Sequence, residues 1–279
     1  MSTVSRKNIR IRDPFILADK ERGCYYMYGT IDLIPHTNSS LPQFSVYKSF
    51  DLETFEGPKV IFDAEAYGFW ADRDFWAPEV HKYGGKYYLF GTCKAENKCR
   101  ATQIFVCDTP DGEYTPLTDS PITPHNWECL DGTLYIENGV PYVIFCHEWL
   151  QVKDGEMWAH QLSPDLKTTV GEPFMLFKAS ENQFAGELNI GTGNYVTDGP
   201  YLYREGGKVK MIWSSYSNKK YLILSAESNS IHGKWVQGKA HFNFDGGHAM
   251  LFHTLNGERK ISFHAPNTTD CERFEYSDF

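Results

Sequence analysis

One unit recurs five times along the 279-residue chain: a short strand, a tight polar turn and a second apolar strand. The units begin at Asp13, Ala77, Asp131, Asp198 and Gly247, at intervals of about 50 to 65 residues, which is close to the blade period of propellers. Four turns contain Gly-Gly or Asn-Gly, which supply the positive φ that tight hairpins need. Because helical periodicity is nearly absent, this repeat predicts an all-β fold.

Further strand signals lie between these units. Two inner strands and one or two outer strands make a four-stranded antiparallel blade, so the repeat predicts a five-bladed β-propeller. The last unit leaves few residues for outer strands, and we expect residues 1–12 to complete it and close the ring. No shift in composition marks a second domain, so we expect residues 1–279 to form a single propeller. The additional strand signals are QFSVYKSFDLETF, ATQIFVCDTPDGEY, EMWAHQLSPDL and YLILSAESNSIHGKW.

Composition supports a folded protein and narrows its partners. Hydrophobic residues make up 41% and charged residues 23% of the chain, a balance that argues against disorder. The net charge of -9 argues against a nucleic-acid partner. No apolar run approaches the roughly 20 residues of a membrane helix. We therefore expect a monomer that binds neither nucleic acid nor a membrane.

The cysteines and the first residues bear on localisation. The chain has seven cysteines and no C-x-x-C pair, and most of the cysteines lie in apolar, strand-like runs. Buried, reduced cysteines of this kind fit a reducing compartment. The first ten residues, MSTVSRKNIR, lack the apolar segment of a secretory signal. We expect a cytoplasmic protein, unless a signal peptide has been removed.

Three aspartates begin strands of the repeat. The first strand of each blade lines the central channel of a propeller, and Asp13, Asp131 and Asp198 occupy what the repeat indicates are equivalent positions. The sequence therefore predicts three carboxylates at one mouth of the channel, where their mutual repulsion is costly unless they have a use. Each one alone is also typical of a turn, because Asp-Pro and Asp-Gly are turn dipeptides.

The second strand of each hairpin returns to the same mouth. VIFCHEW ends such a strand in the third blade, which places His147, Glu148 and Trp149 close to Asp131. Glu148 is a candidate fourth carboxylate at the mouth, a hydrogen-bond partner for a substrate hydroxyl, or only a charge at the end of a strand.

Aromatic residues at the mouth are candidate platforms for binding a ligand. Phe75 and Trp76 precede the second unit, and Trp149 ends the third hairpin. Packing between blades is the alternative interpretation for all three, and it is the stronger one for Phe75.

At these positions the chain resembles glycoside hydrolase family 43. The motifs fall in the family's order, about one to a blade, and together they cover nearly the whole chain. The resemblance implies a five-bladed propeller that hydrolyses arabinofuranosides, xylosides and related plant glycans with inversion, without an essential cofactor. The motifs are RDPF, FWAPEV, LDG, DGP, GGHAMLF and FHAPN, which begin at positions 12, 75, 130, 198, 246 and 263.

The resemblance also implies roles for the aspartates. Asp13 would be the general base that activates water, and Asp131 would orient the general acid and raise its pKa. The family usually has glutamate before Gly-Pro as the acid, whereas this chain has the shorter Asp198. Three hypotheses follow: Asp198 donates the proton, Glu148 has taken over that role, or the protein binds sugar without hydrolysing it.

His248 begins the fifth inner strand. In the family this position lies at the channel centre, where some members hold calcium or another ion through water. The resemblance therefore makes His248 a candidate contact for Ca²⁺, another ion or the substrate. A lone histidine is otherwise more often a hydrogen-bonded core residue.

We expect a hydrolase acting on α-L-arabinofuranosyl or β-D-xylosyl linkages of an oligo- or polysaccharide. Many xylosidases of the family that the chain resembles carry an additional β-sandwich after the propeller, and none follows within these residues, which favours arabinofuranosidase or arabinan-directed action. The alternatives are a carbohydrate-binding propeller without catalysis, a family member acting on another sugar such as a galactoside, and a protein-interaction propeller. The convergent aspartates argue against the last of these.

Overall fold

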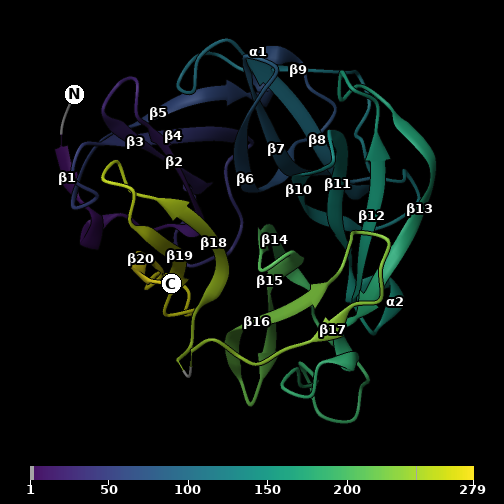
Figure 1. Ribbon diagram of the computed structural model, residues 1–279. Coiled ribbons are helices and arrows are strands. Elements are labelled where there is room, and N and C mark those ends of the chain that lie inside the picture. The colour runs from purple at the N-terminus through teal and green to yellow at the C-terminus, as the bar shows by residue number, and fades with distance from the viewer. Residues whose placement is uncertain (1–2, 243) are drawn as a thin grey trace.

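The structure is a computed structural model that describes residues 3–242 and 244–279, and it forms a ring of five antiparallel sheets around a central axis (Figure 1). The sheets follow one another in chain order, and each begins at the axis and continues outward. The first sheet contains β2 (Arg12–Asp19), β3 (Cys24–Thr30), β4 (Gln43–Ser49), β5 (Thr54–Asp63) and β1 (Thr3–Ser5). The second contains β6 (Arg73–Tyr83), β7 (Lys86–Ala95), β8 (Lys98–Cys107) and β9 (Thr115–Pro116).

The other three sheets complete the ring. The third contains β10 (Cys129–Glu137), β11 (Val140–His147), β12 (Glu156–Leu162) and β13 (Thr169–Lys178). The fourth contains β14 (Asp198–Glu205), β15 (Lys208–Ser217), β16 (Lys220–Ser228) and β17 (Val236–Gln237). The fifth contains β18 (Gly247–His253), β19 (Arg259–Ala265) and β20 (Arg273–Asp278). The short helices are η1 (Arg6–Asn8), α1 (Ala64–Tyr67), α2 (Trp149–Val152) and η2 (Ala179–Glu181).

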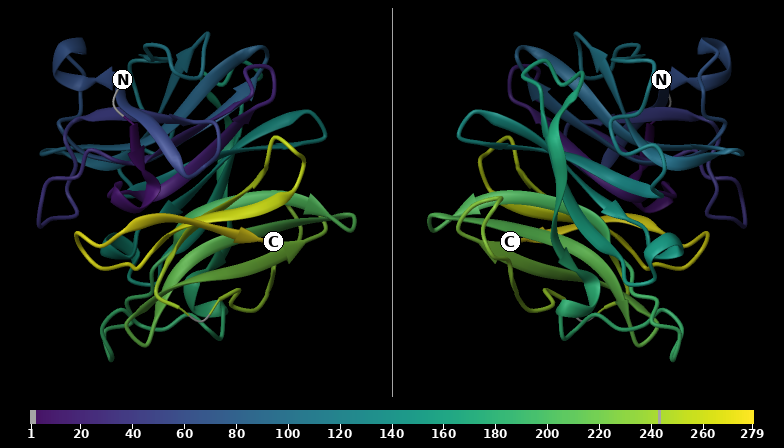
Figure 2. Two further views of the ribbon diagram at one scale, coloured as in Figure 1. Left: turned by 90° about the vertical axis from the view of Figure 1, so that its left-hand side faces the viewer. Right: turned by 90° about the vertical axis from the view of Figure 1, so that its right-hand side faces the viewer.

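This architecture confirms the predicted five-bladed β-propeller. Strands β2, β6, β10, β14 and β18 are the inner strands, and each contacts the inner strands of the neighbouring blades. Side views show the twisted sheets fanning outward from the axis (Figure 2). None of the described helices has the length and apolar character of a membrane-spanning segment.

The tight turns predicted from Gly-Gly and Asn-Gly form as expected in three blades. Both residues of each turn have positive φ, for example Asn138 (52°) and Gly139 (82°) between β10 and β11. The fourth predicted turn, around Gly257, is part of a longer loop in which the Thr254 N–H donates to the Glu258 carbonyl at 2.8 Å.

The prediction for residues 1–12 is wrong in one respect. Residues 3–12 add no fourth strand to the fifth blade, which has three strands among the described residues, and β1 pairs instead with β5 on the outer edge of the first blade. The same segment nevertheless closes the ring: Arg10 forms an antiparallel bridge with Arg273, and the Ile11 N–H donates to the Glu272 carbonyl at 3.3 Å.

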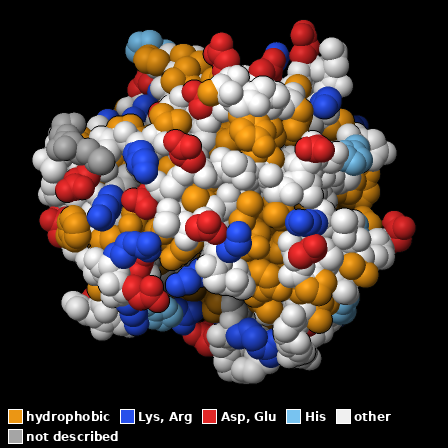
Figure 3. Space-filling model, turned by 90° about the horizontal axis from the view of Figure 1, so that it is seen from above, with side chains coloured by type: hydrophobic (Ala, Val, Ile, Leu, Met, Phe, Trp, Pro, Cys, Tyr) orange, Lys and Arg blue, Asp and Glu red, His pale blue; other side chains and the backbone are white. Residues whose placement is uncertain are grey.

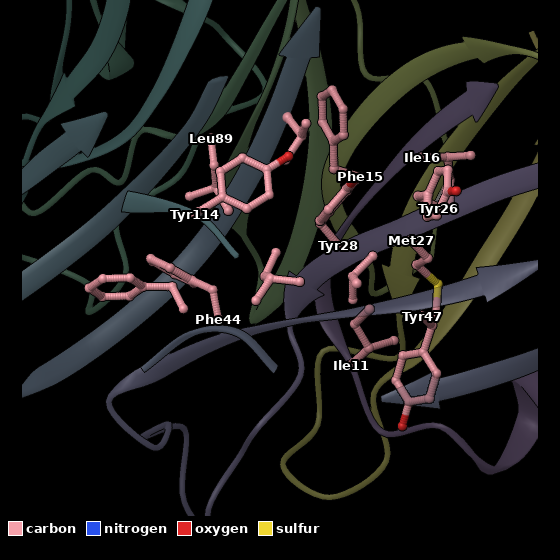
Figure 4. Close-up of a cluster of buried hydrophobic side chains, with 14 of the residues drawn as sticks. Ile11, Phe15, Ile16, Tyr26, Met27, Tyr28, Phe44, Tyr47, Leu89 and Tyr114 are labelled. Atoms are coloured by element: carbon pink, nitrogen blue, oxygen red, sulfur yellow. The ribbon is translucent and has the colours of Figure 1, made fainter. Parts of the chain in front are cut away.

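Apolar side chains pack between the blades. Between blades 1 and 2, Phe44 lies with its ring centroid 5.2 Å from that of Phe75 and 5.6 Å from that of Phe105. Figure 4 shows Phe44, Tyr28, Leu89 and Tyr114 in this region. Burial of each such side chain contributes about 1.5–3 kcal/mol, so these clusters hold the ring together where the blades share no strand.

Most of the cysteines that the sequence places in apolar strands are buried, and the surface carries charges of both signs. Cys24, Cys93, Cys129 and Cys146 are buried in the sheets, and all seven cysteines carry free thiols. On the face shown in Figure 3, acidic and basic side chains are interspersed with apolar ones.

Candidate active site

Every inner strand is interrupted near its start by a β-bulge, where the pairing with the next strand shifts register. Bulges redirect side chains at the ends of strands. The side chains of three bulge residues line one cavity at the axis. In each bulge one residue has the left-handed backbone conformation: Asp13 (φ 56°), Ala77 (45°), Asp131 (55°), Gly199 (50°) and His248 (52°).

Asp198 does not occupy the same bulge position as Asp13 and Asp131. It pairs with Ser214 and directly precedes the left-handed residue Gly199. The prediction of equivalent positions is therefore wrong by one residue for Asp198, because Gly199 and not the aspartate takes the left-handed conformation. Asp198 still lines the same cavity as the other two aspartates.

The cavity has a volume of about 260 Å³ and receives side chains from all five blades. It brings together six of the predicted site residues with Asp13: Asp131, Asp198, Glu148, Trp76, Trp149 and His248. Phe75 and His147 are not among its lining residues. The other lining residues are Arg12, Thr30, Asn38, Leu130, Leu188, Val196, Tyr216 and Tyr221.

Asp13 is held in its ionised form. The Thr30 hydroxyl donates to its Oδ2 at 2.7 Å, and His248 Nδ1 lies 3.2 Å from its Oδ1. Burial opposes ionisation, but His248 and Arg12 outweigh it, so the pKa of Asp13 lies below its ordinary value. Burial lowers the pKa of His264 to about 3, so this neutral ring accepts the Asp13 backbone N–H through Nδ1 at 3.1 Å.

Asp131 is buried in the same cavity as Asp13. Its Oδ2 accepts the Gly199 backbone N–H at 2.9 Å and lies 3.7 Å from His248 Nδ1. Burial, followed by the nearby charge of Asp13, raises the pKa of Asp131. The backbone N–H of Gly199 favours the carboxylate form of Asp131, whereas among the described residues the Asp198 carboxyl accepts no backbone N–H, so Asp131 is better placed to carry the negative charge of this pair.

Asp198, in contrast to Asp131, lies in an environment that favours its protonated form. Burial, followed by the charge of Asp131, raises the pKa of Asp198 to about 8. Its Oδ2 accepts only the Tyr221 hydroxyl, at 3.1 Å, among the contacts of the described residues. A carboxyl group in this environment keeps its proton at neutral pH, as a general acid must.

Glu148 is engaged in a buried ion pair. It lies at the N-cap of α2 and binds Arg100, which also contacts Asp74 at 2.8 Å. Burial raises the pKa of Glu148, and the Arg100 guanidinium opposes that rise. Because Arg100 binds the ionised form of Glu148, this contact argues against Glu148 as the proton donor.

Comparison with known proteins assigns the family. The model of Glycosyl hydrolases family 43 matches residues 7–276. The chain belongs to this family. The match confirms the family and the glycosidase class that the motifs predict.

Two solved structures and one curated protein illustrate the likeness of this family 43 chain. An endo-arabinase from Bacteroides thetaiotaomicron is 42% identical with a TM-score of 0.91, covering 100% of this chain and 97% of its own. An endo-1,4-β-xylanase from the same organism is 25% identical with a TM-score of 0.78, covering 100% and 93%. An extracellular exo-α-(1→5)-L-arabinofuranosidase from Streptomyces avermitilis is 27% identical over 165 residues, which are 56% of this chain and 32% of that protein.

The aromatic residues of this family 43 site separate into two groups. Trp76 lines the cavity, and the Arg100 guanidinium lies over its ring at 4.6 Å from the centroid. Phe75 is only 1% exposed and belongs to the core between blades 1 and 2. His147 stacks on Trp127 with ring centroids 4.4 Å apart, outside the cavity lining. The neighbouring positions 75 and 76 therefore differ in role because one faces the core and the other the cavity.

The ion predicted near His248 stays a prediction. His248 contacts Asp13 and Asp131 through Nδ1. Among residues 3–242 and 244–279, no group of three or more His, Cys, Asp or Glu side chains is arranged to hold a metal ion.

Several residues of the family 43 site were missed by sequence reasoning. Thr30, Tyr221 and Arg100 each contact a predicted carboxyl group from another strand or blade, and no local signal marks such contacts. His264 could have been predicted as a site residue, because it lies in the FHAPN motif.

Proposed function

We propose that this family 43 protein hydrolyses α-L-arabinofuranosyl linkages of arabinan, with inversion at the anomeric carbon. One observation carries the proposal. A single cavity holds two carboxyl groups with opposite behaviour: the pKa of Asp13 is lowered, and that of Asp198 is raised to about 8. Such a pair supplies the base and the acid of glycoside hydrolysis. The names of the 42% identical endo-arabinase and the arabinofuranosidase relative support arabinan as the substrate class.

In the proposed mechanism, Asp13 is the general base. Its carboxylate takes a proton from the water that attacks the anomeric carbon. Thr30 and His248 hold the two carboxylate oxygens, so the group is oriented before substrate binds. This orientation removes a reorganisation step from the barrier.

Asp198 is the proposed general acid, and it protonates the departing glycosidic oxygen. The Asp131 carboxylate keeps the proton on Asp198 until the bond breaks. Above about pH 8 free Asp198 loses its proton, and we expect kcat/KM to fall as pH rises through this value. Trp76, supported by Arg100, provides the proposed platform for a sugar ring.

The test compares debranched α-1,5-arabinan with xylan, using wild type and Asp13→Asn. We expect sugar release from arabinan by wild type, with loss of about 10³-fold or more in the variant because the attacking water has no base. Proton NMR of the first product should show the inverted anomer. Exposed Asp119→Asn is the matched control.

The outcome also separates the competing functions. Turnover of xylan but not arabinan would reassign the protein to xylosyl linkages. A sugar-dependent rise in Tm without turnover of either polymer, or of an aryl glycoside panel that includes galactosides, would identify a binding propeller and contradict the proposal.

A further inference from the structure

At four of the five seams between blades, a side chain of one blade accepts the backbone N–H of the bulge residue in the next blade. Each acceptor lies on the second strand of its blade, opposite the residue that precedes the bulge residue. These bonds satisfy N–H groups that would otherwise be buried without a partner. The pairs are Thr30 Oγ1 with Ala77 (2.9 Å), Thr92 Oγ1 with Asp131 (2.9 Å), Ser214 Oγ with His248 (2.8 Å) and His264 Nδ1 with Asp13 (3.1 Å).

The seam between blades 3 and 4 is the exception. The equivalent position there is Cys146, which lies opposite Leu130 on β11. Its thiol is fully buried, and thiol sulfur is a weak acceptor. The bulge N–H of this seam belongs to Gly199, and it donates to Asp131 Oδ2 at 2.9 Å.

This different hydrogen bond joins two groups of the proposed mechanism. Gly199 directly follows Asp198, so its N–H fixes the Asp131 carboxylate next to the backbone of the proposed acid. The packing here is close, because a Cβ at position 199 would lie 2.8 Å from the His248 ring. A buried backbone N–H bonds to whichever acceptor lies within hydrogen-bond distance, and at this seam that acceptor is the Asp131 carboxylate.

We propose that Cys146 is a positioning residue, which leaves the Gly199 N–H free to hold the Asp131 carboxylate beside Asp198. The inference rests on the proposed function, in which Asp198 donates a proton and Asp131 keeps it protonated. A hydroxyl at position 146 recreates the acceptor of the other seams and takes the Gly199 N–H. Asp131 then loses a charge-assisted hydrogen bond, the stronger kind, and its carboxylate is free to turn away from Asp198.

Two variants of matched shape test this inference. Cys146→Thr introduces the hydroxyl found at positions 30 and 92, and Cys146→Val has the same branching without an acceptor. Each is assayed on α-1,5-arabinan, whose leaving group needs a proton, and on a dinitrophenyl α-L-arabinofuranoside, whose leaving group does not. We expect Cys146→Thr to lower kcat on arabinan about 10-fold or more without changing KM, with dinitrophenyl turnover changed less than about 2-fold. Cys146→Val should keep the wild-type ratio of the two activities.

The inference is overturned if Cys146→Thr keeps the wild-type kcat on arabinan. It is also overturned if both variants lose activity on both substrates in equal proportion, which is the pattern of a packing defect. If Cys146→Thr does not fold, Cys146→Ser supplies the hydroxyl in a side chain no larger than cysteine.

A crystal structure of the hydroxyl variant provides a readout independent of activity. We expect the Gly199 nitrogen within hydrogen-bond distance of the new hydroxyl and no longer bonded to Asp131 Oδ2; retention of the bond to Asp131 contradicts the inference. If wild type hydrolyses neither substrate, the proposed function fails. The crystal structure of the variant still shows whether the Gly199 N–H bonds to the hydroxyl at position 146 or to Asp131.

Discussion

Replacing Asp198 with asparagine tests the raised pKa of the proposed acid without reference to catalysis. Burial, followed by the Asp131 charge, raises the pKa of Asp198 to about 8 in the folded protein, whereas the carboxyl of an unfolded chain ionises near pH 4, at about 3.9. Between these values the folded state binds more protons than the unfolded state. The free energy of unfolding therefore falls as pH rises from about 4 towards 8, and the variant lacks this fall.

The size of the effect follows from the shift. Three pH units, from about 4 to about 7, at about 1.36 kcal/mol each set an upper bound of about 4 kcal/mol. Asp198 is partly exposed in the cavity, so water screens part of the shift, and we expect about 1–3 kcal/mol. At about 2–4 °C per kcal/mol, the Tm advantage of Asp198→Asn over wild type should be roughly 2–12 °C larger at pH 7 than at pH 4.

Thermal unfolding followed across this pH range provides the measurement, with Asp119→Asn as the control at an exposed position. The same preparations should show a loss of about 10²- to 10⁴-fold in kcat/KM on arabinan, because the proton donor is gone. If the Tm difference between Asp198→Asn and wild type is the same at pH 4 and pH 7, Asp198 ionises as an ordinary aspartate. The reasoning that makes it the acid is then refuted.

Two further substitutions separate the roles of neighbouring residues. Glu148→Gln should lower the free energy of unfolding, measured by chemical denaturation, by about 1–3 kcal/mol. This loss is smaller than that for a buried charge left with no partner, because Arg100 still pairs with Asp74. The substitution should leave kcat within about 10-fold of wild type; a loss of about 10³-fold would instead make Glu148 the acid. Trp76→Ala should raise KM for arabinan about 10-fold with kcat nearly unchanged. Phe75 is the neighbouring residue in the core, so Phe75→Leu should lower Tm and leave KM unchanged. Equal effects of the two substitutions on KM would contradict the role of Trp76 as the platform for the sugar.

The ring of blades could be predicted because its signals are local. Tight-turn dipeptides and alternating strands recur at a regular interval, and they fix both the number of blades and the residues that begin the inner strands. The one-residue offset of Asp198 was also present in the sequence, since Pro14, Pro78 and Pro200 align the bulges and place Gly199 with Asp13. The three aspartates by themselves do not reveal that alignment.

The chemistry of the site could be predicted only in part. Asp13, Asp131 and Asp198 meet as the repeat indicates, but their protonation depends on groups from distant segments. Arg100 reaches Glu148 over 48 positions of the chain, and Tyr221 reaches Asp198 from β16. Likewise, β1 pairs with the outer edge of β5 in the first blade, and no local pattern encodes which sheet edge a short strand joins.

The five left-handed bulge residues share one backbone conformation and have quite different side chains: two carboxylates, one imidazole, one methyl group and one hydrogen. The side chain presented at the mouth is thus specified separately from the strand hydrogen bonds in four of the five blades. The fourth blade is the exception, because a Cβ at position 199 would lie 2.8 Å from the His248 ring. Ala77 already accommodates a Cβ at a φ of 45°. A propeller of this kind can therefore acquire a new specificity one blade at a time, without redesign of the ring.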